Sequence, residues 1–293
     1  MTAPAPRFLL SADDYALTPG VSQGIADLAR AGRLSATTAL VTLPGWAGAG
    51  AEVAALRGQI AVGLHLNLTL GAPLGPMPRH APGGRLPPVS TWIRRGLGGG
   101  IDLTEVQAEI ARQIARFEAV AGAPPDLIDG HHHVHALPGV RRALAAALRD
   151  RFEGGPVPLI RVPSDGAWPI LRRRAAPAKA LLVAALAARA RPLFRGLDAP
   201  VNAGFSGFSG FRREVPFAQE LARFCQAPGP VHMVMCHPGH ADAGLQALDP
   251  VAARREDELA ALMAFPDLPA RIHHPAGARG PDGRIGWAFL DAA

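Results

Sequence analysis

The chain has 293 residues, of which 48% are hydrophobic and 18% charged. This composition suits a globular protein with a large buried core and excludes an extended disordered chain. The formal net charge of +6 invites comparison with nucleic-acid binders, but the basic residues are dispersed and aromatic residues make up only 5%, so we expect no nucleic-acid partner.

Short apolar runs alternate with helical segments along the chain, and each run is the right length for a buried strand. The six strands predicted from these runs are, in chain order, Arg7–Ala12, Thr37–Val41, Ile60–Leu68, Leu127–Asp129, Leu159–Val162 and Val231–Cys236. The third run alternates most clearly, because its leucines would face one way while His65 and Asn67 face the other.

Helix start signals separate these strands. They stand at Thr18-Pro19, at the Asp102–Glu105 capping box, at Pro138 and at Asp249-Pro250, and the first two helices are expected to reach about Ala31 and Ala121. Residues 71–100 are rich in glycine and proline and are predicted to form a long loop. Residues 166–215 are expected to be an irregular insertion with one Arg/Ala-rich helix.

Strands that alternate with helices of this length predict βα units and a parallel sheet within a single domain spanning 1–293. Both a doubly wound sheet and a barrel fit this order. The first strand is not followed by G-x-G-x-x-G, which argues against a dinucleotide site. Polar clusters follow several different strands, which favours a barrel with its active site at the carboxyl ends of the strands.

The compartment is predicted from the N-terminus, the cysteines and the apolar runs. No secretory signal is recognisable at the N-terminus, and the two cysteines, Cys225 and Cys236, cannot form a disulfide framework, so a cytoplasmic location is expected. The apolar run Ala180–Ala188 is about half as long as the ~20 residues that a transmembrane helix needs.

Residues that could carry chemistry lie at the ends of the predicted strands. Asp13 and Asp14 follow the first strand, His65 lies in the third, and His237 follows the last. Four histidines occupy five positions from His131 to His135, too many imidazoles to bury without partners. If that segment is extended, the first, third and fifth of its residues share one side.

In a barrel, Asp14, His65 and His131 would point to the same rim. Two imidazoles and one carboxylate leave open coordination positions, as at a catalytic metal site, and the ligand set allows Zn²⁺, Mg²⁺ or Mn²⁺. Asp13 would remain free to act as a general base. We assign the general acid to His237, on the premise that its pKa is near the usual value of ~6.5, and Arg161 could orient Asp13 through a bidentate ion pair.

Several short motifs resemble those of the YdjC-like (ChbG/HpnK) carbohydrate deacetylases. The matching segments are Ser11-Ala-Asp-Asp-Tyr15, Ser35-Ala-Thr-Thr-Ala-Leu-Val41, Gly63-Leu-His-Leu66, Asp129-Gly-His-His-His-Val-His135 and Met235-Cys-His-Pro-Gly239. They occur in the order of the family's motifs and span residues 7–240. Ser11, Tyr15 and Ala16 differ from the family pattern, and residues 166–215 match none of it.

The resemblance implies a deformed (β/α) barrel related to the polysaccharide deacetylases. It also implies one divalent metal ion held by Asp14, His65 and His131, with Asp13 as the base. Such enzymes remove acetyl from N-acetylated amino sugars, in chitooligosaccharides or in a glycosylated lipid. The arginines between Arg172 and Arg195 could serve an anionic or membrane-presented substrate.

Two other functions stay open at this point. A metal-dependent phosphoesterase or amidohydrolase barrel would use similar ligands, although such barrels usually begin with His-x-His on the first strand. A non-catalytic sugar-binding barrel is the other alternative. The sequence leaves undecided which sugar and which metal are used, whether the chain forms a homodimer, and which histidines besides His131 contact metal or substrate.

Overall fold

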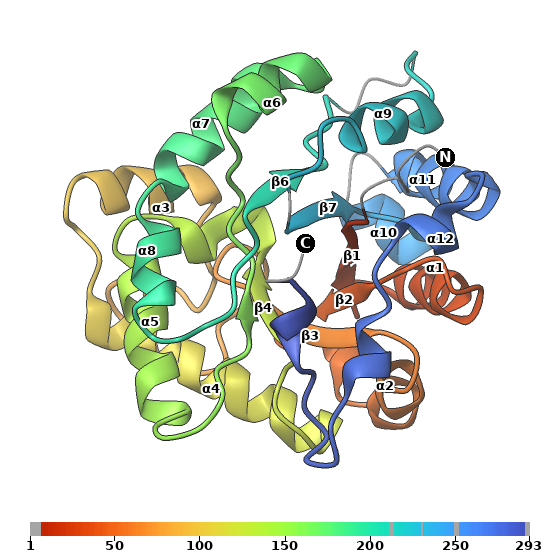
Figure 1. The fold of residues 1–293 in the computed structure, drawn as a ribbon. Coiled ribbons are helices and arrows are strands. Elements are labelled where there is room, and N and C mark those ends of the chain that lie inside the picture. Colours follow the sequence, from red (N-terminus) through yellow and green to blue (C-terminus); the bar gives the residue numbers. More distant parts are fainter. Residues whose placement is uncertain (1–6, 211–213, 230, 249–251, 291–293) are drawn as a thin grey trace.

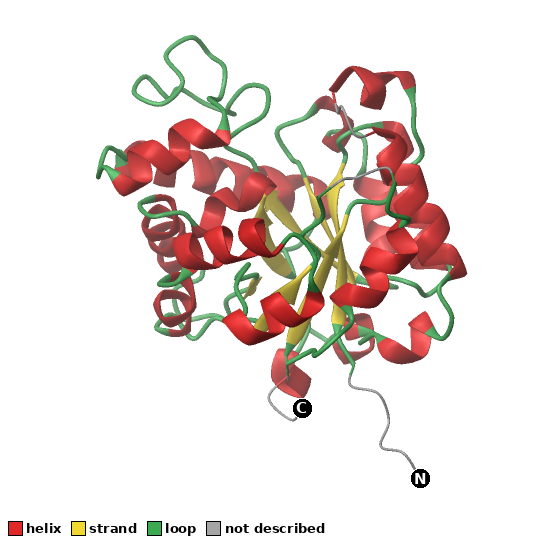
Figure 2. Ribbon diagram, turned by 90° about the horizontal axis from the view of Figure 1, so that it is seen from above, coloured by secondary structure: helices red, strands yellow, loops and turns green. Residues whose placement is uncertain are grey.

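The fold is built around one curled sheet of seven parallel strands, enclosed by helices (Figures 1 and 2). It is seen in a computed structural model that describes residues 7–210, 214–229, 231–248 and 252–290. The strands are β1 (Leu9–Tyr15), β2 (Ala36–Ala39), β3 (Ala61–Leu66), β4 (Leu127–Gly130), β5 (Leu159–Ile160), β6 (Gly204–Ser206) and β7 (His232–Cys236).

Helices follow most strands and cover the outer face of the sheet. The α-helices are α1 (Pro19–Arg30), α2 (Gly50–Arg57), α3 (Val89–Leu97), α4 (Leu103–Ala121), α5 (Val140–Arg151), α6 (Ala167–Arg173), α7 (Pro177–Ala187), α8 (Ala190–Arg195), α9 (Phe217–Phe224), α10 (Ala243–Leu248), α11 (Ala252–Ala264) and α12 (Leu268–Arg271). The 3₁₀ segments are η1 (Pro44–Trp46), η2 (His131–Ala136), η3 (Pro275–Ala278) and η4 (Trp287–Leu290).

The strands are arranged in the order β5-β4-β3-β2-β1-β7-β6, and the sheet curls until its two edges approach each other. Ile160 of β5 forms a parallel bridge with Val201, which lies just before β6. The predicted deformed barrel is therefore confirmed, as a curled seven-stranded half-barrel. Residues 1–6, 211–213, 230, 249–251 and 291–293, which include the cap predicted at Asp249-Pro250, lie outside the described part.

Two groups of buried side chains hold the sheet in place. Alternate residues such as Val62 and Leu64 of β3 pack outward against the helices, and all residues of β3 are buried, as expected for a parallel strand covered on both faces. Leu127 and Met233 face the interior of the barrel, where Trp287 packs with them near the end of the chain. The interior is thus filled by side chains, and the polar residues gather at one end.

Several local predictions are corrected. The segment expected as a loop over 71–100 contains α3, which forms because Trp92 is buried and donates a hydrogen bond to the carbonyl of Leu68 (2.6 Å). Asp102 caps α4 as predicted, but the capping box is incomplete because Glu105 instead accepts hydrogen bonds from the backbone of Arg79 and His80. The described part of residues 166–215 contains three helices and β6 rather than one helix in an irregular segment.

Candidate functional site

Polar residues from five strands meet at the carboxyl end of the half-barrel. Asp13 and Asp14 lie within β1, one or two residues beyond the predicted strand, and His65 lies in β3. The other contributors follow their strands directly, as His131 does after β4, Arg161 after β5 and His237 after β7. Parallel strands bring these ends together although up to 224 residues (237 minus 13) separate them along the chain.

Strand β1 carries an irregularity that turns two consecutive aspartates toward the same site. Its register with β2 shifts between Ala12 and Tyr15, and Asp14 has a left-handed φ of 69°. In a regular strand, neighbouring side chains would point to opposite faces. Here the irregularity lets Asp13 and Asp14 both enter the polar site, each 2% exposed.

Asp14, His65 and His131 form a compact set of ligand atoms. Asp14 Oδ1 lies 3.0 Å from His131 Nδ1 and 3.2 Å from His65 Nε2. The three ligand atoms lie within 4.8 Å of one another, so the group could hold a metal ion. Two imidazole nitrogens and one carboxylate oxygen are typical ligands of a divalent metal ion whose remaining coordination positions are open to water and substrate.

Asp129 orients the imidazole ring of His65. The Nδ1–H of His65 donates to Asp129 Oδ1 (2.6 Å), which turns Nε2 toward Asp14, and Thr38 donates its hydroxyl to Asp129 Oδ2 (3.0 Å). Burial alone would lower the pKa of His65, but the charges of Asp129 and Asp13 raise that pKa to about 10. The site therefore favours a positive charge at His65, which a divalent cation could supply in place of the proton.

Asp13 has a different set of partners. Both of its carboxylate oxygens accept from Arg161, at 2.6 and 2.8 Å, so the predicted bidentate pair is present. The same guanidinium contacts Asp129 Oδ2 at 2.8 Å and is fully buried. Burial, aided by the charge of Asp129, raises the pKa of Asp13 despite Arg161.

The histidine run is not extended, so the prediction that His131, His133 and His135 share one side is wrong. The backbone forms the 3₁₀ segment η2, in which His132 and His133 have φ values of 53° and 57°. His131 reaches Asp14, whereas His135 donates from Nε2 to the carbonyl of Arg161 (2.6 Å). His133 packs edge-on against aromatic rings, with its centroid 5.3 Å from that of Phe208.

His237 lies at the same end of the barrel, partly exposed, and its backbone N–H donates to Glu258 Oε2 (2.6 Å). Burial lowers the pKa of His237 to about 3, and the charges of Arg255, Arg161 and His65 add to this effect, whereas that of Asp14 opposes it. The premise of an unperturbed pKa near 6.5 is therefore wrong. The imidazole is neutral at neutral pH.

Two residues from α11 complete the site and were not predicted. Arg255 donates to Asp14 Oδ2 (2.7 Å), and Glu258 is the partner of His237. Nothing in the sequence singles them out, because they lie on a helix far along the chain. Thr38 and Asp129 lie within the motifs that resemble the family's, but only the three-dimensional contacts reveal what they do.

Residues 7–266 match the family model described as YdjC-like protein. The chain belongs to the YdjC-like family. Within the described residues of this YdjC-like chain, no helix is both long and apolar enough to cross a bilayer.

Two curated relatives of the chain are named chitooligosaccharide deacetylase. The YdjC-like chain is 32% identical over 245 residues to a chitooligosaccharide deacetylase of Serratia marcescens, covering 80% of this chain and 82% of that protein. A chitooligosaccharide deacetylase of Yersinia pestis (strain Pestoides F) is 39% identical over 143 residues, which is 49% of this chain but only 56% of the relative. The match to that relative thus spans little more than half of its length.

A solved structure supports the fold. A protein of Enterococcus faecalis V583, described as a candidate cellobiose-phosphate cleavage protein, superposes with a TM-score of 0.66 and 23% identity, over 98% of this chain and 99% of that one. The YdjC-like chain thus shares its architecture with that protein over nearly the whole length of both.

Proposed function

We propose that this YdjC-like protein is a metal-dependent hydrolase that removes acetyl from an N-acetylated amino sugar, in a chitooligosaccharide or a GlcNAc-bearing glycolipid. The observation that carries the proposal is the Asp14–His65–His131 set lying beside the Asp13–Arg161 pair. Two relatives named chitooligosaccharide deacetylase support the choice of substrate class.

A single Mg²⁺ or Zn²⁺ ion is the proposed cofactor, held by Asp14, His65 and His131. When bound, such an ion polarises the acetyl carbonyl and lowers the pKa of a water molecule. Arg255 donates a hydrogen bond to Asp14 Oδ2 (2.7 Å), so the other oxygen, Oδ1, is directed toward the two imidazoles. Asp129 fixes the ring of His65 by accepting from its Nδ1–H.

Asp13 is the proposed general base. Its raised pKa makes the carboxylate a better proton acceptor than an ordinary aspartate at neutral pH. Arg161 holds both oxygens, so that the remaining lone pairs have a fixed direction toward the attacking water. We assign Arg161 to positioning rather than to proton transfer.

His237 is the proposed donor to the leaving amine. Because its imidazole is neutral in the resting site, His237 can donate to the amine only after it has taken up a proton, and the proton that Asp13 removes from the attacking water would be its source. Negative charge that develops on the acetyl oxygen nearby would favour that uptake. The resulting imidazolium would be strongly acidic, and an amine leaves a tetrahedral intermediate readily only after it is protonated.

The compartment is proposed from the two cysteines. Cys225 and Cys236 are both buried and free, which fits the reducing cytoplasm that the sequence suggests.

The proposal is tested by measuring acetate released from diacetylchitobiose with and without a chelator. Release that stops on chelation and returns with Zn²⁺ or Mg²⁺ is the expected result. Binding of the sugar without any acetate release, in the metal-reconstituted protein, would instead assign the chain to the non-catalytic sugar-binding barrels.

A further inference from the structure

Helices α6 and α7 expose an unusual concentration of large apolar side chains. Of the six large hydrophobic residues exposed in the described part of the chain, four lie on these two helices. Their exposed fractions are 63% for Trp168, 55% for Leu171, 37% for Leu181 and 60% for Leu182. Helices α6 and α7 pack against each other (Figure 1), so two neighbouring helices carry these four side chains. Exposed apolar side chains gathered in this way mark an interaction surface.

The charged side chains of α6, α7 and the turn between them are all basic. Residues 166–197 include seven basic residues and no aspartate or glutamate. Arg172, Arg174 and Lys179 are exposed on or beside α6 and α7, and Arg173 is buried against Asp165. Arg189, Arg191 and Arg195 lie in α8 or just before it. The whole chain carries only +6, so this segment accounts for its excess of positive charge. A surface that combines leucine and tryptophan with arginine suits the boundary between lipid headgroups and acyl chains.

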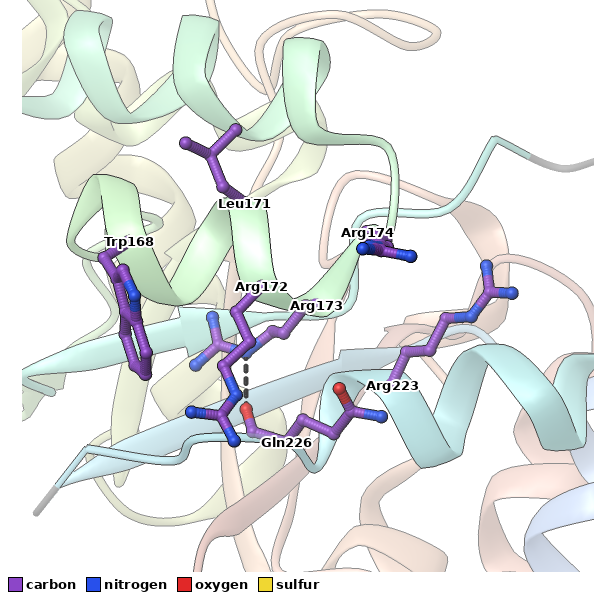
Figure 3. Close-up of a pocket in the computed structure, with 7 residues that line it drawn as sticks. All are labelled: Trp168, Leu171, Arg172, Arg173, Arg174, Arg223 and Gln226. Atoms are coloured by element: carbon purple, nitrogen blue, oxygen red, sulfur yellow. Dashed lines mark hydrogen bonds between the residues drawn. The ribbon is translucent and has the colours of Figure 1, made fainter.

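A cavity of about 560 Å³ lies against α6 and is lined by arginines (Figure 3). Arg172 and Arg174 come from α6 and its end, and Arg223 comes from α9. None of the seven described residues that line it is acidic. Arg172 lies over the ring of Trp168, with 4.9 Å between its Cζ and the ring centroid. The cavity thus places guanidinium groups next to an exposed indole, which suits an anionic phosphate headgroup beside lipid.

This surface adjoins the polar end of the barrel. Helix α7 packs against η2, the segment that begins at His131. A bilayer that contacts α6 and α7 would therefore lie beside the proposed active site.

We propose that α6 and α7 form a docking surface for a bilayer that contains anionic phospholipid, with headgroup phosphates in the arginine-lined cavity and Trp168, Leu171, Leu181 and Leu182 in the interface. A second copy of the chain is a poorer occupant, because pairing this surface with itself would oppose two cationic segments. A nucleic acid would match the charge but leave the leucines without a partner. Docking does not depend on the proposed deacetylase activity.

The test is flotation of the full chain with vesicles of phosphatidylcholine alone or mixed with phosphatidylglycerol, in the absence of any sugar. Binding to the mixed vesicles that weakens with salt is expected, together with a blue shift of tryptophan emission that Trp168→Phe removes. Each arginine near an anionic surface contributes about fivefold in affinity. The double variant Arg172→Gln/Arg174→Gln should therefore bind roughly 25-fold more weakly, and Leu182→Ser should also bind more weakly.

Leu248→Ser and Arg30→Gln are the matched controls, because they alter an exposed leucine and an exposed arginine on α10 and α1. Both should bind vesicles as the wild type does. The proposal is overturned if the wild type binds neither vesicle, or if the controls lose binding as much as the α6 and α7 variants. Self-association or DNA binding that these variants abolish, without vesicle binding, would assign the surface to another occupant. Because no substrate is present, a failure here is distinct from a failure of the deacetylase assay.

Discussion

Asp13 and Asp14 are neighbours in β1 but have opposite electrostatic surroundings. Burial raises the pKa of Asp13 despite the opposing charges of Arg161 and His65, and Asp13 shares Arg161 with Asp129. Burial also acts on Asp14, but the charges of His131 and Arg255 outweigh it and hold the pKa of Asp14 well below the usual value. A carboxylate that stays ionised suits a metal ligand, and one whose proton affinity is raised suits a base.

This contrast predicts different outcomes for the two aspartates. Asp13→Asn should retain the bound metal but reduce turnover by about 10²–10⁴-fold, the typical contribution of a general base. Asp14→Ala should lose both metal and activity, because it removes a ligand. Metal analysis of the purified variants, combined with acetate release, checks both. An Asp13→Asn protein that stays active would overturn the assignment of the base.

Asp129 should act on the metal through His65. Asp129→Asn removes the carboxylate that accepts from the His65 Nδ1–H, and we expect the affinity for the metal to fall by about 10–100-fold. Thr38→Val removes only the hydroxyl that donates to Asp129, so its effect should be smaller. Competition titration with a chromogenic chelator measures both affinities. Equal affinities in Asp129→Asn and wild type would contradict this role.

At the scale of elements, α6 places neighbouring arginines in different environments. The side chain of Arg173 is 3% exposed, where it contacts Asp165 at 2.6 Å and donates to the carbonyls of Gln226 and Ala227. Arg172 is exposed and lies over Trp168. Arg173 therefore ties α6 to the segment after α9, and Arg172 is available to a ligand.

Arg173→Ala should consequently destabilise the fold by about 3–5 kcal/mol, because it leaves the carboxylate of Asp165, whose side chain is only 10% exposed, without its cation. Arg172→Ala, at an exposed position of the same helix, should change the free energy of unfolding by no more than about 0.5 kcal/mol. Urea unfolding of the two variants compares them directly. Similar losses of stability would show that the contacts of Arg173 contribute little.

On the scale of the whole molecule, histidines buried in neutral form couple the fold to pH. His232 is 1% exposed and contacts Ser206 Oγ at 2.8 Å, and burial lowers its pKa to about 3. His135 is fully buried, and burial lowers its pKa to about 4. Unfolded histidine has a pKa of ~6.5, so below that pH the unfolded chain binds protons that the folded chain excludes.

The stability that these residues contribute is thus present above about pH 6.5 and is lost as the pH falls toward 4. In this pH window, each of the two histidines should increase the slope of the unfolding free energy against pH by at most about 1.4 kcal/mol per pH unit. Urea unfolding at several pH values should show a shallower slope for His232→Gln than for the wild type.

Much of the architecture was predictable from local sequence. Buried parallel strands are rich in apolar residues, so the runs that became β1, β3, β4 and β7 stand out from the chain. Helix caps are equally local, since the Thr18 hydroxyl accepts from the backbone N–H of Val21 within one turn. Strand β6 was missed because its three residues, Gly204–Ser206, carry too little pattern to be recognised.

Local sequence was enough to predict which side chains could converge, because parallel strands end at one rim and Asp14, His65 and His131 follow or occupy those ends. How they converge depends on contacts made in the folded chain. The left-handed backbone at Asp14 and in η2 redirects side chains that strict alternation would have placed elsewhere. Arg255 and Glu258 reach the site from α11 through the packing of the helix against the barrel, and no local pattern encodes a contact made across 241 residues.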